Sequence, residues 1–466
     1  MSLKKKGILF LVFLGIYTIY FSTSTGMNTS NDGGHIALAK AIYYDHQFSV
    51  EKYLDVYVKI PDYALKDGQI YSDRLPGMAT LIIPAYGYAN VLKNVGISTS
   101  NSQNEIDIVV ASILPSLFGL LSALLLFWYY YKVLRKKFSI SLICTIIYAF
   151  TTLAWLESSH LFSHAPSLFF VSLAVLFIIS DPKRTKWQYQ LMIVSILLGF
   201  ATWIELQNFL FFFPILGYII HRNALVKKET RIKFAKYMLL SLFIVGVFLC
   251  GLMAYNYAVF DEFTLKSNKF NPFFPEEHSF ITALSGNIFQ GLDNLYTSFG
   301  NISAYFDPSE ARLNKIPGVF VTSPVMILSA MGFFFYYKKY KAKALVLISC
   351  ILIATIIAAM HVTTLVRHIY TVNLFLFLPF LFFLEYVLEL SNKSRRNLYI
   401  ILICVLVLIS FVRVWFSTVS YWGRNFDNLF LYKEELGIFF IANLPLILIL
   451  GAFLGFRNRY KVQINP

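Results

Sequence analysis

Long apolar stretches recur along this 466-residue chain and constrain its fold more than any other feature. A helix needs about 20 mainly apolar residues to cross the hydrocarbon core of a bilayer. Only 14% of the residues are charged, against roughly 25% in soluble domains. The sequence therefore predicts an all-α, polytopic membrane protein with about 12 transmembrane helices, near 7–25, 107–131, 138–156, 166–180, 189–206, 208–220, 236–259, 318–337, 344–361, 369–390, 398–418 and 436–456.

Lysine and arginine gather in alternate connections between these stretches, which predicts an orientation. They are dense in 132–137, 183–186, 222–236, 338–343 and 393–396, whereas most acidic residues lie in the other connections. Because cytoplasmic loops carry an excess of Lys and Arg, we expect both termini in the cytoplasm of a multi-pass protein of the cell membrane. Basic loops facing anionic lipid headgroups also explain the net charge of +15 without nucleic acid.

The whole chain, 1–466, is predicted to be a single membrane domain, and two of its exterior connections are long. The first long loop covers 26–105 and the second covers 260–317. Within the first, the apolar segment 77–92 would break the alternation of charges if it crossed the membrane, so we expect an exterior helix lying along the bilayer surface. The second loop mixes aromatic and amide side chains, which suit carbohydrate but are equally ordinary in an exposed loop.

Polar residues collect in the first loop at Asn31-Asp32-Gly33-Gly34, just before a helix expected from His35 to His46. In such an apolar chain, ionisable residues mark candidate functional positions. Asp32 has two interpretations: it caps the following helix, or it is a general base that takes a proton from an attacking hydroxyl. His35, three residues after Asp32, is the first residue of that expected helix.

A second group in this loop is Tyr71-Ser72-Asp73-Arg74-Leu75-Pro76-Gly77, immediately before the surface helix. Arg74 would lie at headgroup depth, where it could contact lipid phosphates. Its guanidinium could instead hold the phosphate of a lipid-linked substrate through two parallel hydrogen bonds.

Two further groups lie at exterior ends of predicted spans. Arg367, His368 and Tyr370 stand where a loop enters the span 369–390, and Arg367 either reaches up to headgroups or faces a phosphate inside the bundle, which we favour. Glu157, His160 and His164 have a helical spacing that could bind zinc. Ala165-Pro166 after them favours a new helix start, so that they line a substrate pocket instead of binding a metal.

Together these groups resemble the GT-C class of membrane glycosyltransferases, and within it the branch of protein O-mannosyltransferases and lipid A aminoarabinose transferases. The likeness rests on an Asp shortly after the first span and on the Arg74-Leu75-Pro76 turn before a surface helix. It extends to the stretches HLFSHAPSLFFVSLAVLF, KIPGVFVTSPVMILSAMGFF and LVRHIYTVNLFLFLPF. The chain departs from the branch at Asp32-Gly33, where Asp-Glu is common, and at Arg74-Leu75-Pro76, where Lys-Pro-Pro is common.

The resemblance implies a GT-C-like bundle with juxtamembrane helices in the first loop, and an exterior active site. It implies that Asp32 is the catalytic base and that Arg74 and Arg367 hold the donor phosphate. No metal or other cofactor is expected to be required, because the loop has no Asp-x-Asp pair near Asp32 and cationic side chains supply the positive charge. The expected activity is hexosyl or pentosyl transfer from a polyprenyl-phosphate sugar to a glycan, lipid or protein acceptor, with inversion at the anomeric carbon. The substrate pocket would be lined by His35, Asp73, Glu157, His160, His164, His368 and Tyr370.

Two other functions stay open from the sequence. A flippase or transporter of lipid-linked glycans would need charged residues deep within several spans, whereas here the charges cluster at span ends. An oligosaccharide ligase or polymerase would share the fold class and the exterior site.

Overall fold

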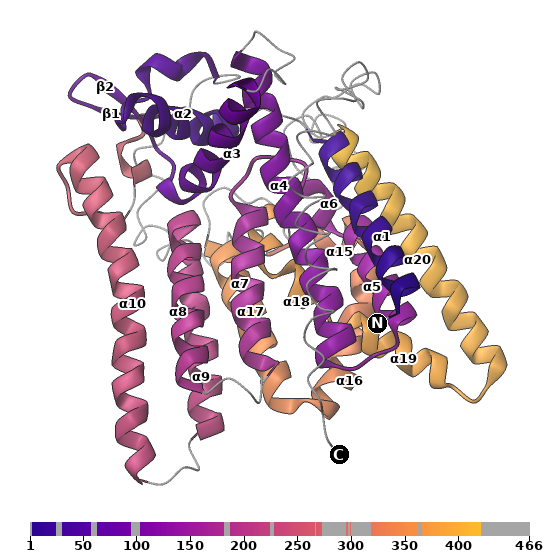
Figure 1. The fold of residues 1–466 in the computed structure, drawn as a ribbon. Coiled ribbons are helices and arrows are strands. Elements are labelled where there is room, and N and C mark those ends of the chain that lie inside the picture. Colours follow the sequence, from indigo (N-terminus) through magenta and orange to yellow (C-terminus); the bar gives the residue numbers. More distant parts are fainter. Residues whose placement is uncertain are drawn as a thin grey trace.

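Long helices form a bundle in the computed structural model, and one end of that bundle is covered by shorter elements (Figure 1). The structure describes residues 2–24, 30–56, 63–94, 103–180, 187–223, 228–265, 267–272, 295–296, 299, 318–360 and 366–420. We call residues 30–56 and 63–94, which cover the end of the bundle, the cap.

Helices occupy every predicted membrane stretch within the described residues, and the last stretch, 436–456, lies outside them. Seven helices of the described part are long and apolar enough to cross a membrane, and two more are apolar but shorter. The predicted all-α, polytopic membrane fold is therefore confirmed. The bundle contains α1 (Leu3–Ser22), α4 (Gln103–Trp128), α5 (Phe138–Thr151), α6 (Leu153–Glu157), α7 (His164–Ile179), α8 (Trp187–Ile204), α9 (Phe212–Asn223), α10 (Lys228–Phe260), α15 (Val319–Thr322), α16 (Val325–Lys339), α17 (Lys341–Met360), α18 (Asn373–Phe377), α19 (Phe380–Glu389) and α20 (Lys393–Ser420).

Several predicted spans are divided where the sequence pattern suggests one continuous helix, and two of them show the cause. The stretch 138–156 breaks at Thr152, whose backbone is extended and whose side chain accepts a hydrogen bond from the backbone N–H of Ala154, the second residue of α6. The stretch 369–390 becomes a short helical turn, η5 (Val366–Val372), followed by α18 and α19. Pro379 precedes α19, and its ring cannot donate the backbone hydrogen bond that would continue α18.

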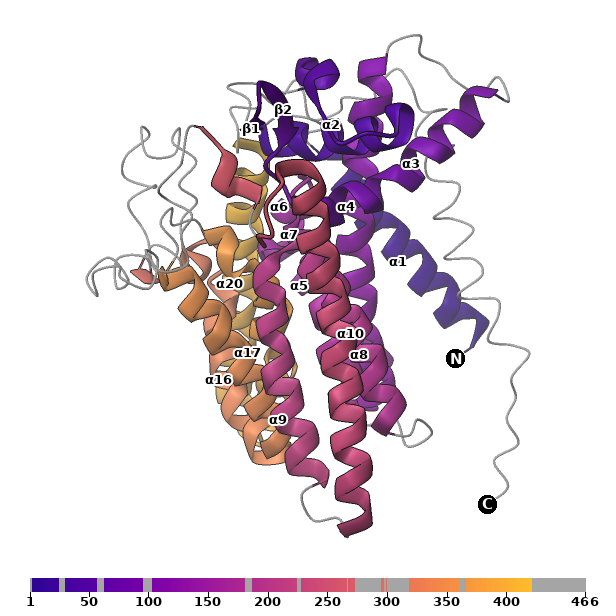
Figure 2. The same cartoon turned by 90° about the vertical axis from the view of Figure 1, so that its left-hand side faces the viewer.

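The cap contains α2 (Ser30–Asp45), η1 (Glu51–Val56), α3 (Pro76–Asn94) and a β-hairpin. Figure 2 shows α2 and α3 across the end of the bundle. The hairpin pairs β1 (Tyr63–Lys66) with β2 (Gln69–Ser72) and was not predicted. Its turn, Asp67-Gly68, has positive φ at both residues, which is the backbone that an Asp-Gly turn of type I′ adopts. The helix α2 begins at Ser30 instead of His35, so Asp32 lies inside its first turn.

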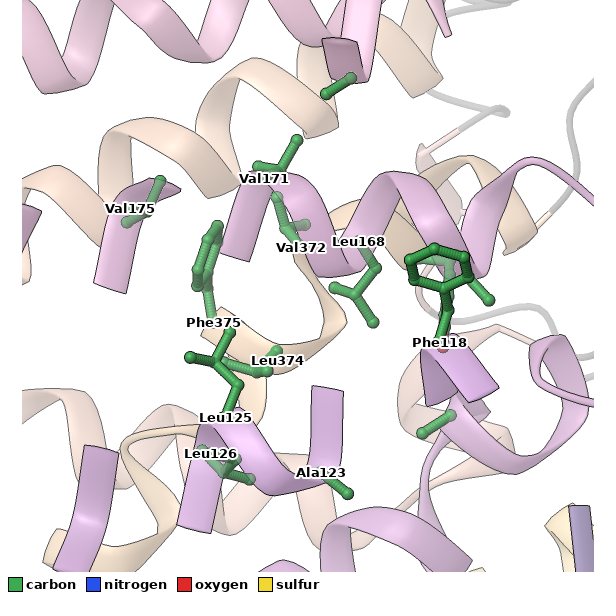
Figure 3. Close-up of a cluster of buried hydrophobic side chains, with 14 of the residues drawn as sticks. Phe118, Ala123, Leu125, Leu126, Leu168, Val171, Val175, Val372, Leu374 and Phe375 are labelled. Atoms are coloured by element: carbon green, nitrogen blue, oxygen red, sulfur yellow. The ribbon is translucent and has the colours of Figure 1, made fainter. Parts of the chain in front are cut away.

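A buried apolar cluster fixes the part of the bundle beneath the cap (Figure 3). Phe118 and Leu125 come from α4, Leu168 comes from α7, and Val372 and Phe375 come from η5 and α18. All five side chains are buried. Within a membrane such residues gain mainly from close packing, because lipid tails are as apolar as they are. This packing holds the start of α7 and the turn η5 in fixed positions.

An ion pair joins two residues at the end of the bundle away from the cap. Lys136, just before α5, pairs with Glu385 of α19, and both side chains are largely buried. Lys136 belongs to the basic segment 132–137, which is predicted to be cytoplasmic, and Glu385 lies near the end of the span 369–390 that leads to the basic segment 393–396. Their meeting at one end of the bundle agrees with the alternation of charged loops.

Candidate functional site

Asp32 and His35 lie on the part of α2 that is buried against the rest of the protein. Asp32 is 0% exposed and His35 is 3% exposed. A carboxylate in the first turn of a helix is stabilised by the positive end of the helix dipole and the free backbone N–H groups there. Asp32 is therefore not placed as the residue before the helix, as the capping interpretation requires, but within it.

The side chain of Ser72 ties α2 to the turn that carries Arg74. Its Oγ donates a hydrogen bond of 3.1 Å to the carbonyl oxygen of Gly34 and accepts one of 3.2 Å from the backbone N–H of Arg74. Ser72 itself is 0% exposed. The two polar groups of the first loop, one around Asp32 and one around Arg74, are thus joined through a single buried hydroxyl.

Asp73 is held from both sides, so it serves as an anchor for the loop. Its Oδ1 lies 3.2 Å from Nε of Arg74, and Asn271 donates a hydrogen bond of 3.0 Å to its Oδ2. Ser267, at the start of η4 (Ser267–Phe270), donates a bond of 2.9 Å to the backbone carbonyl of Asp73. The second long loop therefore meets the first at this residue, and the side chain of Arg74 stays partly exposed beside them.

A buried carboxylate, Glu205, faces this part of the cap from the end of α8. Its Oε1 lies 2.6 Å from Nδ1 of His164 and accepts a bond of 2.7 Å from Ser163. Its Oε2 accepts bonds of 3.1 Å from Ser167 and 3.2 Å from Gln207. Glu205 was not among the predicted site residues. The sequence does place polar residues at two span ends, 163–167 and 205–208. Nothing in it indicates that those two ends lie side by side in the folded protein.

The protonation of this group is set by burial and by its neighbours. Burial disfavours the ionised carboxylate, but the ring of His164 and the hydroxyls of Ser163 and Ser167 outweigh it and lower the pKa of Glu205 to about 2. Burial and the positive charge of Arg74 lower the pKa of His35 to about 3, although the negative charge of Glu205 acts to raise it. His35 is therefore neutral at physiological pH, and too weak a base for proton abstraction there.

Glu157, His160 and His164 do not share a helix, as Pro166 indicated. Glu157 is the last residue of α6, and His164 is the first of α7. Between them, Nδ1 of His160 lies 2.8 Å from the carbonyl oxygen of Leu156. Aromatic packing through Phe162 connects the rings of His160 and His164, at 5.6 and 6.0 Å between ring centroids. Within the described residues, no group of three His, Cys, Asp or Glu side chains could hold a metal ion.

The predicted residues of η5 are described in part. Tyr370 is 0% exposed, and η5 packs against both α6 and α7. The side chains of Arg367 and His368 lie outside the described residues, so the convergence of Arg367 with Arg74 stays a prediction.

Comparison with known proteins identifies the fold of this chain. No protein-family model and no curated protein matches the sequence. Among solved structures, the chain resembles the oligosaccharyltransferase AglB from Archaeoglobus fulgidus, solved in complex with an inhibitory peptide and a dolichol-phosphate, at 12% identity and a TM-score of 0.55. The match covers 91% of this chain but only 57% of AglB.

A second similar structure is ArnT from Cupriavidus metallidurans bound to undecaprenyl phosphate. It matches at 11% identity and a TM-score of 0.50, over 98% of this chain and 79% of ArnT. At identities this low, the structural similarity establishes the fold alone, and the activity has to be argued from the site. The chain has the fold of the GT-C class of membrane glycosyltransferases.

Proposed function

We propose that this chain is an integral membrane glycosyltransferase that moves a sugar from a polyprenyl-phosphate donor to an acceptor hydroxyl. The reaction takes place at the cap, which we assign to the exterior face of the cell membrane. Support for a lipid-phosphate donor comes from the two similar structures, which hold dolichol-phosphate and undecaprenyl phosphate.

The observation that carries the proposal is the link from Gly34 through Ser72 to Arg74. It joins the helix of Asp32 to the backbone of Arg74, whose guanidinium remains partly exposed. Sugar transfer from a lipid phosphate needs those two chemistries side by side, namely a base for the acceptor and a positive charge for the leaving phosphate.

In the proposed reaction the acceptor oxygen attacks the anomeric carbon as its proton passes to the carboxylate of Asp32. A new bond forms between that oxygen and the anomeric carbon, and the bond from the anomeric carbon to the phosphate oxygen breaks. Direct displacement through an oxocarbenium-like state inverts the anomeric centre. Arg74, joined by Arg367, stabilises the negative charge that grows on the departing polyprenyl phosphate. These cations take the role that a metal ion has in other transferases.

The substrate pocket in this proposal lies between the cap and the starts of α7 and η5. Asp73 positions Arg74, and the acceptor and sugar contact the remaining predicted residues, His35, Glu157, His160, His164, His368 and Tyr370. Glycan, lipid and protein acceptors all present a suitable hydroxyl.

A second candidate is transfer of a whole oligosaccharide from the lipid. The observation that favours it is the structural similarity to AglB, an oligosaccharyltransferase. The same donor site would serve both reactions, and they differ in the size of the glycan that is moved.

The test is a transfer assay with purified protein and synthetic polyprenyl-phosphate donors that carry one sugar or an oligosaccharide. We expect product formation without nucleotide sugar, and its loss in Arg74→Ala. The control is Lys52→Ala, which removes a basic cap residue whose side chain is 64% exposed. Translocation of the donor across vesicles without any transfer product would support a flippase and contradict the proposal.

A further inference from the structure

In the proposed reaction His164 only lines the substrate pocket, and its partner Glu205 has no task. It is one of the most completely bonded polar groups at the cap end of the bundle. Four side chains surround the carboxylate of Glu205, at distances of 2.6 to 3.2 Å. A further layer supports them, because the buried Asn208 donates bonds to Ser167 (2.6 Å) and to the backbone carbonyl of Ala201 (2.9 Å).

The geometry of the pair fixes which atom of the imidazole carries a proton. Since the pKa of Glu205 is about 2, its carboxylate is ionised at physiological pH and can only accept hydrogen bonds. The proton between the two groups therefore belongs to Nδ1 of His164. A neighbouring negative charge also favours a second proton on Nε2, which would make the ring a cation.

The pair lies beside the turn of Arg74. The start of α3 packs against the end of α8, where the backbone of Gly77 lies over that of Trp203. Arg74 is three residues before Gly77, and Glu205 is two residues after Trp203. The buried ring of His35 responds to the charges of Arg74, Glu205 and His164 together, which places all three around one polar region.

The charges around the start of α7 leave a phosphate short of positive partners. Neither α8 nor the described side chains of α4 contribute a charged residue. On η5, Arg367 and His368 have side chains outside the described residues. Among the described residues, the charges that act on the buried ring of His35 are those of Arg74, Glu205 and His164. Asp32, Asp73 and Glu157 add buried carboxylates to the cap and to α6, and His160 adds a buried imidazole. Carboxylates therefore outnumber Arg74 among these described side chains, and a protonated His164 is a further cation that an incoming anion can use.

We propose that His164, held in place by Glu205, is a further cation for the donor phosphate beside the two arginines, and that donor binding is coupled to uptake of one proton by its imidazole. This inference rests on the proposed function. It adds a pH-dependent step to donor binding, which a purely structural role of the pair would not produce.

The test measures the affinity of the purified protein for a synthetic polyprenyl-phosphoryl sugar between about pH 5.5 and pH 8.5, a range that spans the ordinary titration of histidine. A phosphodiester keeps one negative charge throughout, whereas a phosphate monoester titrates near pH 6 and would confuse the result. We expect the affinity to fall as the pH rises, by up to about tenfold per pH unit, which is the limit for one coupled proton.

Three variants distinguish an effect of the proton on His164 from an effect on folding. His164→Gln should weaken binding about tenfold at the acid end and remove the pH dependence. Glu205→Gln removes the charge that favours the second proton, so the fall in affinity should move to lower pH. His164→Arg carries a permanent charge and should bind with little dependence on pH. The control is His221→Gln, which changes an exposed histidine in the last turn of α9, and thermal unfolding checks that each variant is folded.

Two results would overturn the inference in different ways. Wild-type affinity and pH dependence in a folded His164→Gln protein would show that the imidazole carries no coupled charge. Absence of any donor binding or transfer by the wild-type protein would contradict the proposed function itself, and the inference with it.

Discussion

Gly77 lies so close to Trp203 that a β-carbon built on Gly77 would be 2.4 Å from both the carbonyl carbon and the carbonyl oxygen of Trp203. Atoms at that distance overlap, and a backbone cannot move aside as a flexible side chain can. The absence of a side chain at Gly77 therefore lets the cap rest directly on the end of α8. This contact sets the separation between the turn of Arg74 and the carboxylate of Glu205.

Gly77→Ala should accordingly destabilise the protein and displace the cap. Overpacking a tight contact costs about 1–3 kcal/mol, so we expect a lower midpoint of thermal unfolding in detergent and weaker donor binding. Gly87→Ala is the matched control on the same helix, because a β-carbon there meets only the hydroxyl of Tyr43, at 3.9 Å. Alanine in a helix is also favoured over glycine by about 1 kcal/mol. Equal unfolding midpoints for the two variants would mean that the cap does not depend on this contact.

A similar close approach joins α16 to the break between α18 and α19. A β-carbon at Gly332 would lie 2.1 Å from the carbonyl oxygen of Pro379. Gly332→Ala should therefore lower the thermal midpoint, with a cost of about 1–3 kcal/mol for forcing the helices apart. Gly246→Ala on α10 has no atom within 4 Å of the new carbon and should leave the midpoint unchanged or raised. If both variants unfold at the wild-type temperature, these helices pack less closely than described.

Burial of His35 should make stability depend on pH. Its pKa is about 3 in the folded protein against an ordinary value of 6.5, so the unfolded chain binds a proton that the folded protein excludes. The stabilising contribution is complete above pH 6.5 and is lost as the pH falls toward 3, by at most about 1.4 kcal/mol per pH unit. The ordinary pKa of Glu205 is 4.5, so its effect on stability falls mainly below pH 5.

The measurement is the thermal midpoint at several values between about pH 7 and pH 5, within the range where histidine ordinarily titrates. His35→Gln should show a smaller loss of midpoint across this range than the wild-type protein. His46→Gln, an exposed residue just after α2, controls for the loss of a histidine. An unchanged slope in His35→Gln would argue that His35 is accessible to protons in the folded state.

The orientation predicted from charge can be tested with single cysteines. In a background lacking the native cysteines, Ser102→Cys and Ser394→Cys lie on predicted exterior and cytoplasmic segments respectively. An impermeant thiol reagent applied to intact cells should label the first and spare the second, because cytoplasmic loops are the basic ones. Labelling of the second alone would place the cap in the cytoplasm and remove the basis for an exterior reaction.

The helix bundle could be predicted because each of its helices is indicated by residues that are adjacent in the sequence. Each membrane helix is encoded by its own run of apolar residues, and the alternation of basic loops orders these runs. The hairpin was encoded as well, by Asp67-Gly68 between short segments of strand-forming residues. Its strands are only four residues long, which hides them in a chain dominated by helices.

The candidate site could be predicted only within one loop. Asp32 and Arg74 share the first loop, so a meeting of their segments could be expected from the sequence, whereas the bridging hydroxyl of Ser72 could not. Glu205 and His164 are 41 residues apart and meet because α7 and α8 pack side by side. Without that packing, Glu205 reads as an isolated acidic residue at the end of a span. The start of α2 was also missed, since Gly33-Gly34 disfavours a helix locally and burial of α2 against α3 and α4 overrides that preference.

The most direct measurement of the central claim compares sugar transfer and donor binding in Asp32→Asn. Asparagine keeps the size of the side chain and can remain in the first turn of α2, but its amide has no basic oxygen at neutral pH. Asp45→Asn, at the other end of the same helix, is the control. Loss of general-base assistance costs about 10²–10⁴ in rate, so we predict that Asp32→Asn loses at least about 100-fold in transfer while binding the donor as the wild-type protein does. Transfer by Asp32→Asn at close to the wild-type rate would contradict the account.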